Sequence, residues 1–416
     1  MDHNPAPHLW SIKLQAPDLR IGSNGKGPTR MEAMASAYCE LVERISIGMI
    51  AGIWLAPFRQ LHGRASKLIT DVEFFKYMDG YSWGHQDSLQ NTIKVEELLR
   101  EVRFTRGQFD MLKMRSEFLR HWIPGHSLLT HEDRLVPAML LKWISATNGI
   151  ASGNTIEEAI VHATCEIFER DALIKYLRRM NKVPAKTVIP ESISDSRIQD
   201  ILQFFEEHNV EVIIKDLSFD TYPVYAVLTF NHNMPENQLG MNFIKSGSAM
   251  SNTEALMRCF TERMQGTTFA VEAQMKADAI TEIDQKYMPV MFSGVCPFSL
   301  APFKEDDERV EFKEWELNNT KVEIDECLRI ARKLDTDLVV LDHTHHMFDL
   351  PTVRVVMPGV SDFIKWWDST KLTLDFIGNI EPEEDRYEEA LIHLLKTFQP
   401  SHLESSVARN KSRRDT

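Results

Sequence analysis

Three stretches of the sequence place glutamates at helical spacing, and two of them are close copies. The segment EAMASAYCELVER (Glu32–Arg44) returns 126 residues later as EAIVHATCEIFER (Glu158–Arg170). A weaker third copy, EALMRCFTERMQG (Glu254–Gly266), begins 96 residues after the start of the second. All three fit the pattern E-A-x-x-x-[AC]-x-x-E-x-x-[EQ]. Because residues that favour helices, such as Ala, Met, Leu and Glu, dominate these stretches, we predict that each forms a helix.

The polar positions of each copy share one face of its helix, because residues three and four apart are neighbours there. These positions are Ser36, Glu40 and Glu43 in the first copy, Glu158, His162, Glu166 and Glu169 in the second, and Glu254, Arg258, Glu262 and Gln265 in the third. Like charges at this spacing mildly destabilise a helix. A cost repeated in three helices indicates that something cationic lies between them.

The types of residue narrow the choice of cation and ligand. Carboxylate oxygens without Cys or several His favour Mg²⁺ over zinc or copper. The copies also carry Arg44, Arg170 and Arg258, and guanidinium groups suit phosphate oxygens. Carboxylates, magnesium and arginines together point to a nucleoside triphosphate.

Two other interpretations of the glutamates stay open. A single acidic helix face is usually just solvated surface. A di-iron carboxylate bundle also uses glutamate-rich helices, but it needs Glu-x-x-His pairs. His162 precedes Glu166 by four residues, so the di-iron interpretation fits less well.

Each acidic stretch follows a segment rich in small residues, which we interpret as a turn at the start of the helix. These segments are residues 23–30, 147–155 and 246–253. Glycine permits a close approach of the backbone, and a helix N-terminus offers free N–H groups to phosphate. None of the segments matches the phosphate-binding patterns GxxxxGK[ST] or GxGxxG. Lys26 is a phosphate contact or an ordinary turn lysine, and Thr155 and Thr253 are the predicted helix caps.

The composition excludes several classes of protein. The 416 residues are 43% hydrophobic and 26% charged, as in soluble globular proteins. A net charge of −14 argues against binding a nucleic-acid backbone. Five cysteines without a CxxC pair give neither a disulfide framework nor a zinc site. The N-terminus lacks a signal-peptide pattern and the longest apolar stretch, residues 48–58, is too short to span a bilayer, so we expect a cytoplasmic protein without membrane contact.

The offset of 126 residues recurs in a second unit, which consists of a helix and two strands. Residues 197–230 contain the helix DILQFFEEH and the strands VEVIIKDL and VYAVLTF. Residues 322–358 contain the helix EIDECLRIARKL and the strands DLVVLDHT and TVRVVMPG, and Asp216 aligns with Asp342. Two such units predict an α+β fold with sheets covered by helices. Because the two repeats interleave along the chain, we predict a single pseudo-symmetric domain.

These segments together resemble the YcaO family of ATP-dependent enzymes, which activate peptide backbone amides. The family signature S-x3-E-x2-E-R is matched by Ser36, Glu40, Glu43 and Arg44. The second acidic helix follows NGIASGNTIEEA, which is similar to the family's N-G-x-A-x-G stretch. The sequence LDHTHHMFDLPTVRVVMPGV is similar to the family's T-x-P-V-x-R-V-x-P-G ending. The resemblance runs from about Ser23 to Val360.

The resemblance implies an ATP and Mg²⁺ site built on the three acidic helices. The residues expected to hold magnesium are Glu40, Glu43, Glu166, Glu169 and Glu262. The residues expected to contact the nucleotide are Lys26, Ser36, Glu158, Arg170, Arg258 and Gln265. The family's chemistry phosphorylates an amide oxygen, and no side chain of this sequence stands out as a protein nucleophile.

Two departures from the family pattern bear on the expected function. Only 35 residues precede Ser36, fewer than in most members, so another polypeptide is expected to supply contacts. The Pro-rich C-terminus of azoline-forming members is absent. We therefore expect thioamide formation on a peptide or protein, with a TfuA-like partner. The alternatives are an azoline-forming cyclodehydratase with a peptide-recognition partner, and a nucleotide-binding accessory protein for methylthiolation of a ribosomal protein.

The resemblance and the composition also give a division of the chain. We predict a short N-terminal segment over residues 1–22 and a YcaO-like domain over 23–360. A helical extension is expected over 361–399 and a disordered tail over 400–416. The sequence leaves open whether the protein forms a homodimer.

Overall fold

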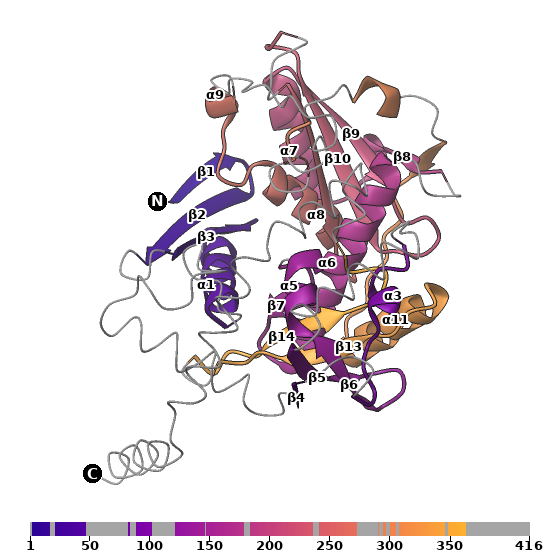
Figure 1. Ribbon diagram of the computed structural model, residues 1–416. Helices are drawn as coiled ribbons and strands as arrows, with labels where there is room; N and C mark the ends of the chain where they lie inside the picture. Colours follow the sequence, from indigo (N-terminus) through magenta and orange to yellow (C-terminus); the bar gives the residue numbers. More distant parts are fainter. Residues whose placement is uncertain are drawn as a thin grey trace, which may run out of the picture.

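The computed structural model is an α+β fold in which helices cover three β-sheets (Figure 1), and the predicted fold class is confirmed. The structure describes residues 2–16, 21–46, 82–83, 89–101, 121–145, 147–178, 184–235, 241–272, 290, 294–296, 300–304, 308–345 and 348–362. The apolar stretch 48–58 and the predicted segments beyond residue 362 lie outside these ranges. In the described part, no helix is long and apolar enough to cross a bilayer.

The strands form three separate sheets. The first contains, in spatial order, β1 (Asp2–Ala6), β2 (Leu9–Ala16) and β3 (Ile21–Gly27). The second contains β11 (Asn242–Ser248), β10 (Val224–Asn231), β9 (Val210–Asp216), β8 (Lys186–Ile189) and β12 (Arg309–Glu311). The third contains β4 (Ser82–Trp83), β5 (His121–Ser127), β13 (Val339–Asp342), β14 (Thr352–Val356) and β7 (Ile150–Ser152), with β6 (Asp133–Pro137) also paired to β5. All pairs are antiparallel except β8 with β12.

The helices pack on the faces of these sheets. The longer ones are α1 (Arg30–Ser46), α5 (Ala138–Ser145), α6 (Ile156–Leu177), α7 (Ser196–Glu207), α8 (Asn252–Arg263) and α11 (Thr320–Lys333). Single turns of helix form at α3 (Val95–Leu98) and α9 (Phe269–Glu272). The three predicted acidic helices are α1, α6 and α8, so their existence is confirmed.

The predicted repeat of a helix and two strands is also confirmed. It appears as α7, β9 and β10 in one unit and as α11, β13 and β14 in the other. The aligned aspartates perform the same local task, since each accepts a hydrogen bond from the backbone N–H two residues on. The bond from Ser218 N to Asp216 Oδ1 and that from Thr344 N to Asp342 Oδ1 both measure 2.7 Å. Each aspartate thus ends its strand in a turn of the Asx type.

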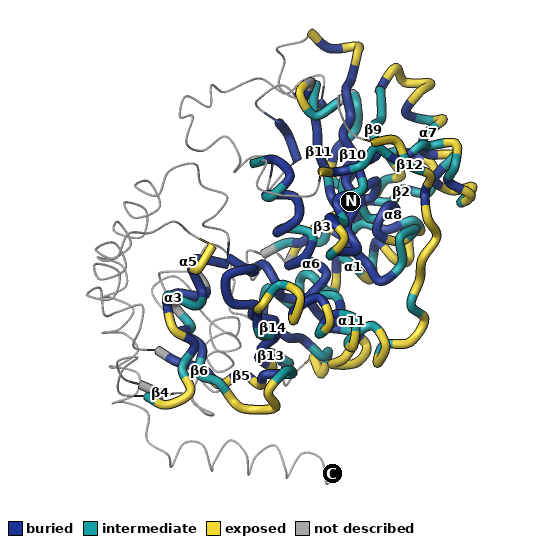
Figure 2. Tube along the Cα trace, turned by 90° about the vertical axis from the view of Figure 1, so that its right-hand side faces the viewer, coloured by how far each residue is buried: buried dark blue, intermediate teal, exposed yellow. Residues whose placement is uncertain are grey.

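Helix α6 lies between the second and third sheets and is the central element of the fold. Fourteen of its 22 residues are buried, and it contacts β10 and β11 on one side and β7 and β14 on the other. Strand β10 is buried along its whole length, whereas α7 and α11 expose one face (Figure 2). The glutamates of α6 therefore emerge from a helix that is otherwise packed in the core.

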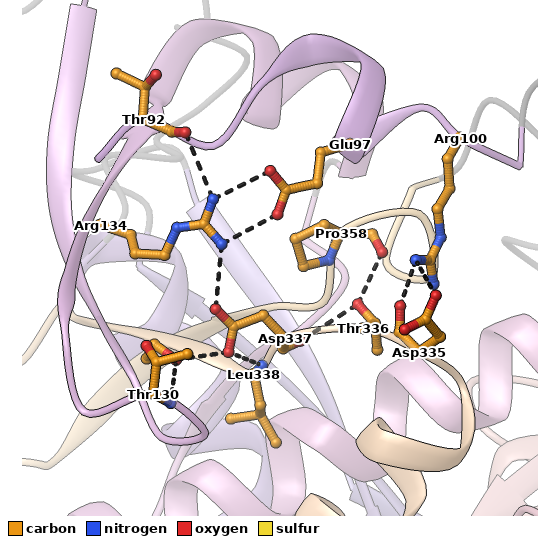
Figure 3. A network of polar contacts seen from close by, with 11 residues as sticks. Thr92, Glu97, Arg100, Thr130, Arg134, Asp335, Thr336, Asp337, Leu338 and Pro358 are labelled. Carbon is orange, nitrogen blue, oxygen red and sulfur yellow. Dashed lines mark hydrogen bonds and ion pairs between the residues drawn. The ribbon is translucent and has the colours of Figure 1, made fainter. Parts of the chain in front are cut away.

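A polar network fastens the segment around α3 to the third sheet (Figure 3). Both Nη atoms of Arg134 lie 3.0 Å from the Glu97 carboxylate, and Nη1 lies 3.3 Å from Asp337 Oδ2. Asp337 Oδ1 accepts hydrogen bonds from the Ser127 hydroxyl (2.6 Å) and from the Leu338 N–H (2.7 Å). Asp337 thus accepts hydrogen bonds from β5, from β6 and from the residue directly before β13.

We expect Asp337→Ala to lower the free energy of unfolding by about 2 kcal/mol, because it leaves the Ser127 hydroxyl and the Leu338 N–H without this acceptor and removes one of the two carboxylates that face Arg134. Urea denaturation of both proteins measures this. Asp133→Ala is the control, since the Asp133 side chain is 82% exposed and its contact with His126 is a surface one. Such pairs contribute about 0–1 kcal/mol. Equal losses in the two variants would contradict the importance of the network.

Candidate nucleotide and metal site

Each acidic helix directly follows a strand at the edge of its sheet. Strand β3 leads into α1, β7 into α6 and β11 into α8, and each strand lies at one end of its sheet's order. Residues 23–27, 150–152 and 246–248 of the small-residue segments are strand, so the interpretation of these parts as turns is wrong, whereas residues 147–149 do form a turn. The edge strands bring three equivalent strand–helix units together, one from each sheet.

Two glycines allow these helices to lie directly on their strands. A Cβ added at Gly25 of β3 would come within 1.9 Å of the Ala33 carbonyl oxygen. A Cβ added at Gly247 of β11 would come within 2.3 Å of the Ala255 carbonyl oxygen. Both distances are far below van der Waals contact, so no residue with a side chain fits without moving the helix. The close packing fixes where the glutamates of α1 and α8 emerge.

The first glutamate of each copy belongs to the cap of its helix. The hydroxyls of Thr155 and Ser251 accept from the N–H groups of Glu158 and Glu254, at 3.2 and 3.3 Å. The Glu158 carboxylate in turn accepts from the Asn154 N–H at 2.9 Å. The arrangement is that of a capping box, except that the second N–H belongs to Asn154, the residue before the cap, and it satisfies N–H groups at the helix start. The predicted cap Thr155 is confirmed; Thr253 is wrong, because Ser251 caps α8.

The inner glutamates connect the three units into a closed ring. Glu43 Oε1 of α1 accepts from the N–H and the hydroxyl of Ser152 in β7, at 2.8 and 2.7 Å. Glu169 Oε1 of α6 accepts from the Ser246 hydroxyl in β11 at 3.0 Å. Gln265, just after α8, donates to the Asn24 carbonyl oxygen in β3. Each helix therefore contacts the strand of the next unit, and the third returns to the first.

Other contacts hold the glutamates within their own units. Asn24 N–H donates to Glu40 Oε2 at 3.0 Å, and Gly149 N–H donates to Glu166 Oε2 at 3.3 Å. Arg44 forms an ion pair with Glu40, and Arg170 Nη2 lies 3.9 Å from Glu166 Oε1. Predicted residues from all three helices thus meet in one place. The sequence had indicated something cationic between the three helices, which requires that they meet.

The carboxylates of α1 and α6 carry more negative charge than the neighbouring cations offset. Burial raises the pKa of Glu166 to about 7, against the lowering effect of Arg170, and the neighbouring charges of Glu169 and Glu43 act in the same direction as burial. Burial also raises the pKa values of Glu43 and Glu169. Crowded carboxylates of this kind favour an additional cation.

The third helix differs, because lysines face its glutamate. Glu262 forms an ion pair with Lys26 of β3, and Lys245 Nζ of β11 lies 3.6 Å from Glu262 Oε2. Burial opposes the charged carboxylate, but the two ammonium groups outweigh it and lower the pKa of Glu262 to about 2. This glutamate is therefore ionised and already paired.

The carboxylate oxygens of the ring are hard donors, the type of ligand that Mg²⁺ requires. Within the described ranges, no three His, Cys, Asp or Glu side chains gather into a ready-made metal site. Mg²⁺ in nucleotide sites is usually held by one or two carboxylates together with phosphate oxygens and water. Pairs of hard oxygen donors on neighbouring helices fit that kind of binding.

One position of the ring was missed among the predicted site residues. Ser36, His162 and Arg258 occupy equivalent positions, four residues before Glu40, Glu166 and Glu262. Ser36 Oγ accepts from the Lys26 N–H at 3.4 Å, and Arg258 Nη1 donates to the Ser248 carbonyl oxygen at 3.1 Å. Burial and the charge of Arg258 lower the pKa of His162, which favours the neutral imidazole. Equivalence to Ser36 and Arg258 was the signal that could have identified His162.

Curated relatives resemble the chain over most of its length. An uncharacterised protein of Haemophilus influenzae is 26% identical over 86% of this chain and 60% of its own length. The ribosomal protein S12 methylthiotransferase accessory factor YcaO of Escherichia coli is 24% identical over 86% of this chain and 61% of its own. An uncharacterised protein encoded in the tfuA 3′ region of Rhizobium leguminosarum is 24% identical over 81% of this chain. The chain thus spans about three fifths of the first two relatives.

Solved structures share the fold. A heterocyclase in complex with substrate and cofactor superposes with a TM-score of 0.60 at 19% identity, covering 86% of this chain and 49% of that one. YcaO from Methanopyrus kandleri, bound with AMPPCP and Mg²⁺, gives 0.52 at 16% identity and covers 86% and 85%. The family model "YcaO cyclodehydratase, ATP- and Mg²⁺-binding" matches residues 24–361, which include all three acidic helices. The chain therefore belongs to the YcaO family, whose domain binds ATP and Mg²⁺.

Proposed function

We propose that the ring of three strand–helix units binds ATP with Mg²⁺ and activates a backbone amide of a peptide or protein by O-phosphorylation. The observation that carries the proposal is the closed ring formed by Glu43 of α1, Glu169 of α6 and Gln265 after α8, in which burial disfavours the charged form of the carboxylates. The metal of a metal–nucleotide complex favours that charged form. The membership of the YcaO family supports the same function.

The residues of the ring divide into two groups by charge. The carboxylates that would hold Mg²⁺ are Glu40, Glu43, Glu166, Glu169 and Glu262. The side chains that would contact the nucleotide are Lys26, Ser36, Glu158, Arg170, Arg258 and Gln265. Bound Mg²⁺ would neutralise phosphate charge during transfer, as in other phosphoryl-transfer enzymes. The protein itself positions the groups, and its cations offset the charge that develops.

The reaction that we favour is thioamide formation with a TfuA-like partner. The amide oxygen takes the γ-phosphoryl group and ADP leaves; sulfide then adds to the amide carbon, and phosphate departs with the former amide oxygen. The relative encoded in the tfuA region supports this choice. An external sulfur donor and a protein partner are therefore part of the proposal.

Two alternatives rest on other relatives. The family description names a cyclodehydratase, which favours azoline formation by a Cys, Ser or Thr side chain of the substrate. The Escherichia coli relative is named as an accessory factor, which favours a nucleotide-binding role without amide chemistry. The mass of the modified substrate separates them: exchange of oxygen for sulfur, loss of one water, or no change.

Nucleotide binding tests the site itself. We expect Glu40→Gln and Glu166→Gln to weaken binding of ATP with Mg²⁺ at least about tenfold, because each removes a negative charge that would face the metal. Titration calorimetry of the whole chain measures this. Glu157→Gln is the matched control, since Glu157 lies on α6 beside Glu158 but is exposed. If both ring variants bind as tightly as the wild type, the site is misassigned.

A further inference from the structure

The ring of carboxylates already contains a cation that belongs to the chain. Lys26 occupies the position in β3 that Ser152 occupies in β7 and Ser248 in β11, so it breaks the pseudo-threefold pattern. Its ammonium group forms an ion pair with Glu262 of α8, and the Lys26 side chain is only 28% exposed. A lysine thus replaces a small hydroxyl residue at the place where the ring closes.

The surroundings of Lys26 involve all three acidic helices. Burial disfavours its charged form, but Glu262, Glu40 and Glu169 outweigh this effect and raise the pKa of Lys26. Each of these three glutamates comes from a different helix of the ring. Lys26 is therefore a permanently charged group held between the same carboxylates that would meet a metal ion.

Lys26 and a divalent cation compete for the same carboxylate. An ammonium group and Mg²⁺ repel each other, so Glu262 cannot bind both closely without a further anion between them. Lys245 Nζ, 3.6 Å from the other oxygen of Glu262, adds to this repulsion. A phosphate group would remove the conflict, because it gives Lys26 a new partner of opposite charge.

We propose that Lys26 is the resident counter-ion of Glu262 and is released from it only when a nucleotide phosphate arrives, so that metal and nucleotide bind together and not singly. This inference rests on the proposed nucleotide site and deepens it. It assigns Lys26 a role before the nucleotide binds, in addition to that of a phosphate contact. Lys26 then prevents the ring from binding a divalent cation without its nucleotide.

Metal binding without nucleotide tests the proposal directly. Mn²⁺ replaces Mg²⁺ as the probe, because free Mn²⁺ can be counted by electron paramagnetic resonance. We expect Lys26→Met to bind Mn²⁺ alone at least about tenfold more tightly than the wild type, since Glu262 then loses the cation with which it forms its direct ion pair. The gain in Mn²⁺ affinity from adding AMPPCP should be smaller in Lys26→Met than in the wild type, because the nucleotide no longer has to release Lys26 from Glu262.

Control variants separate the charge of Lys26 from its size. Lys26→Arg keeps the positive charge and should bind Mn²⁺ alone as poorly as the wild type. Lys13→Met, on the neighbouring strand β2 and exposed, should also leave Mn²⁺ binding unchanged. Lys26→Gln is a second neutral variant, and a thermal melt of each variant verifies that it is folded.

The outcomes distinguish the inference from the proposed function. If the wild type binds Mn²⁺ with AMPPCP but neither neutral variant gains affinity for Mn²⁺ alone, the counter-ion role is wrong and the nucleotide site stands. The same holds if Lys26→Arg gains as much as Lys26→Met. If the wild type does not bind AMPPCP with Mn²⁺ at all, the nucleotide site fails and the inference with it.

Discussion

Glu262→Gln is expected to weaken binding of ATP with Mg²⁺ at least about a hundredfold and to lower the free energy of unfolding by about 3 kcal/mol. Glu262 is the partner of two largely buried lysines, since Lys26 and Lys245 both face its carboxylate. Neutralising it removes a proposed metal ligand and leaves two ammonium groups near each other without their anion. Calorimetry measures the affinity, and urea denaturation measures the stability.

A double variant separates the two parts of this effect. Glu262→Gln combined with Lys26→Met removes one of the unpaired ammonium groups, so we expect it to recover part of the stability while nucleotide binding stays weak. Such a cycle isolates the interaction between the two residues. Glu157→Gln on α6 is again the control and should change neither quantity. A Glu262→Gln protein that is as stable as the wild type would show that the lysines do not depend on this carboxylate.

The sequence was most informative where the chemistry repeats locally. The three acidic helices were predictable because their glutamates and alanines recur at fixed spacing within one helix. The units α7–β9–β10 and α11–β13–β14 were predictable because apolar runs such as VYAVLTF mark buried strands. In both cases the signal lies within a few dozen consecutive residues.

The sequence was least informative where distant segments meet. The strand character of β3 and β11 was missed because Ser23, Gly25 and Gly247 have low strand propensity, and pairing with β2 and β10 together with packing against a helix keeps them extended. The pair of Lys26 and Glu262 joins residues 236 apart, so no local pattern indicates it. The helix cap of α8 was placed two residues late, at Thr253 instead of Ser251, because both residue types cap helices well.

The ring also explains why the sequence alone could propose ligands but not their arrangement. Glu43 and Glu169 reach the strand of the next unit, whereas Glu40 and Glu166 stay with their own. In the repeat, Glu43 aligns with Glu169 and Glu40 aligns with Glu166. Nothing in the sequence around either pair shows which of them reaches the next unit. The closed order of the three sheets, which is a property of the fold, distinguishes them.

Gly25→Ala is expected to lower the free energy of unfolding by about 3 kcal/mol or more and to weaken nucleotide binding, although Gly25 contributes no side chain. The added Cβ would lie 1.9 Å from the Ala33 carbonyl oxygen and 2.4 Å from the Ala37 nitrogen, both in the backbone of α1. Backbone cannot rotate away as a side chain can, so α1 must shift from β3. Glu40 and Glu43 move with α1, and the ring loses its geometry.

Gly266→Ala is the matched control for this prediction. Gly266 has a φ of 69°, but a Cβ there would meet nothing within 4 Å. Gly266→Ala should therefore lower the free energy of unfolding by only about 1 kcal/mol, because alanine disfavours the left-handed backbone conformation. Gly247→Ala repeats the clash of Gly25→Ala in the third unit. It should therefore also lower the free energy of unfolding and weaken nucleotide binding, in this case by shifting α8. Urea denaturation measures the free energy of unfolding, and titration with ATP and Mg²⁺ measures the affinity for the nucleotide. If Gly25→Ala costs no more than Gly266→Ala, the close contact of helix and strand is not what positions the carboxylates.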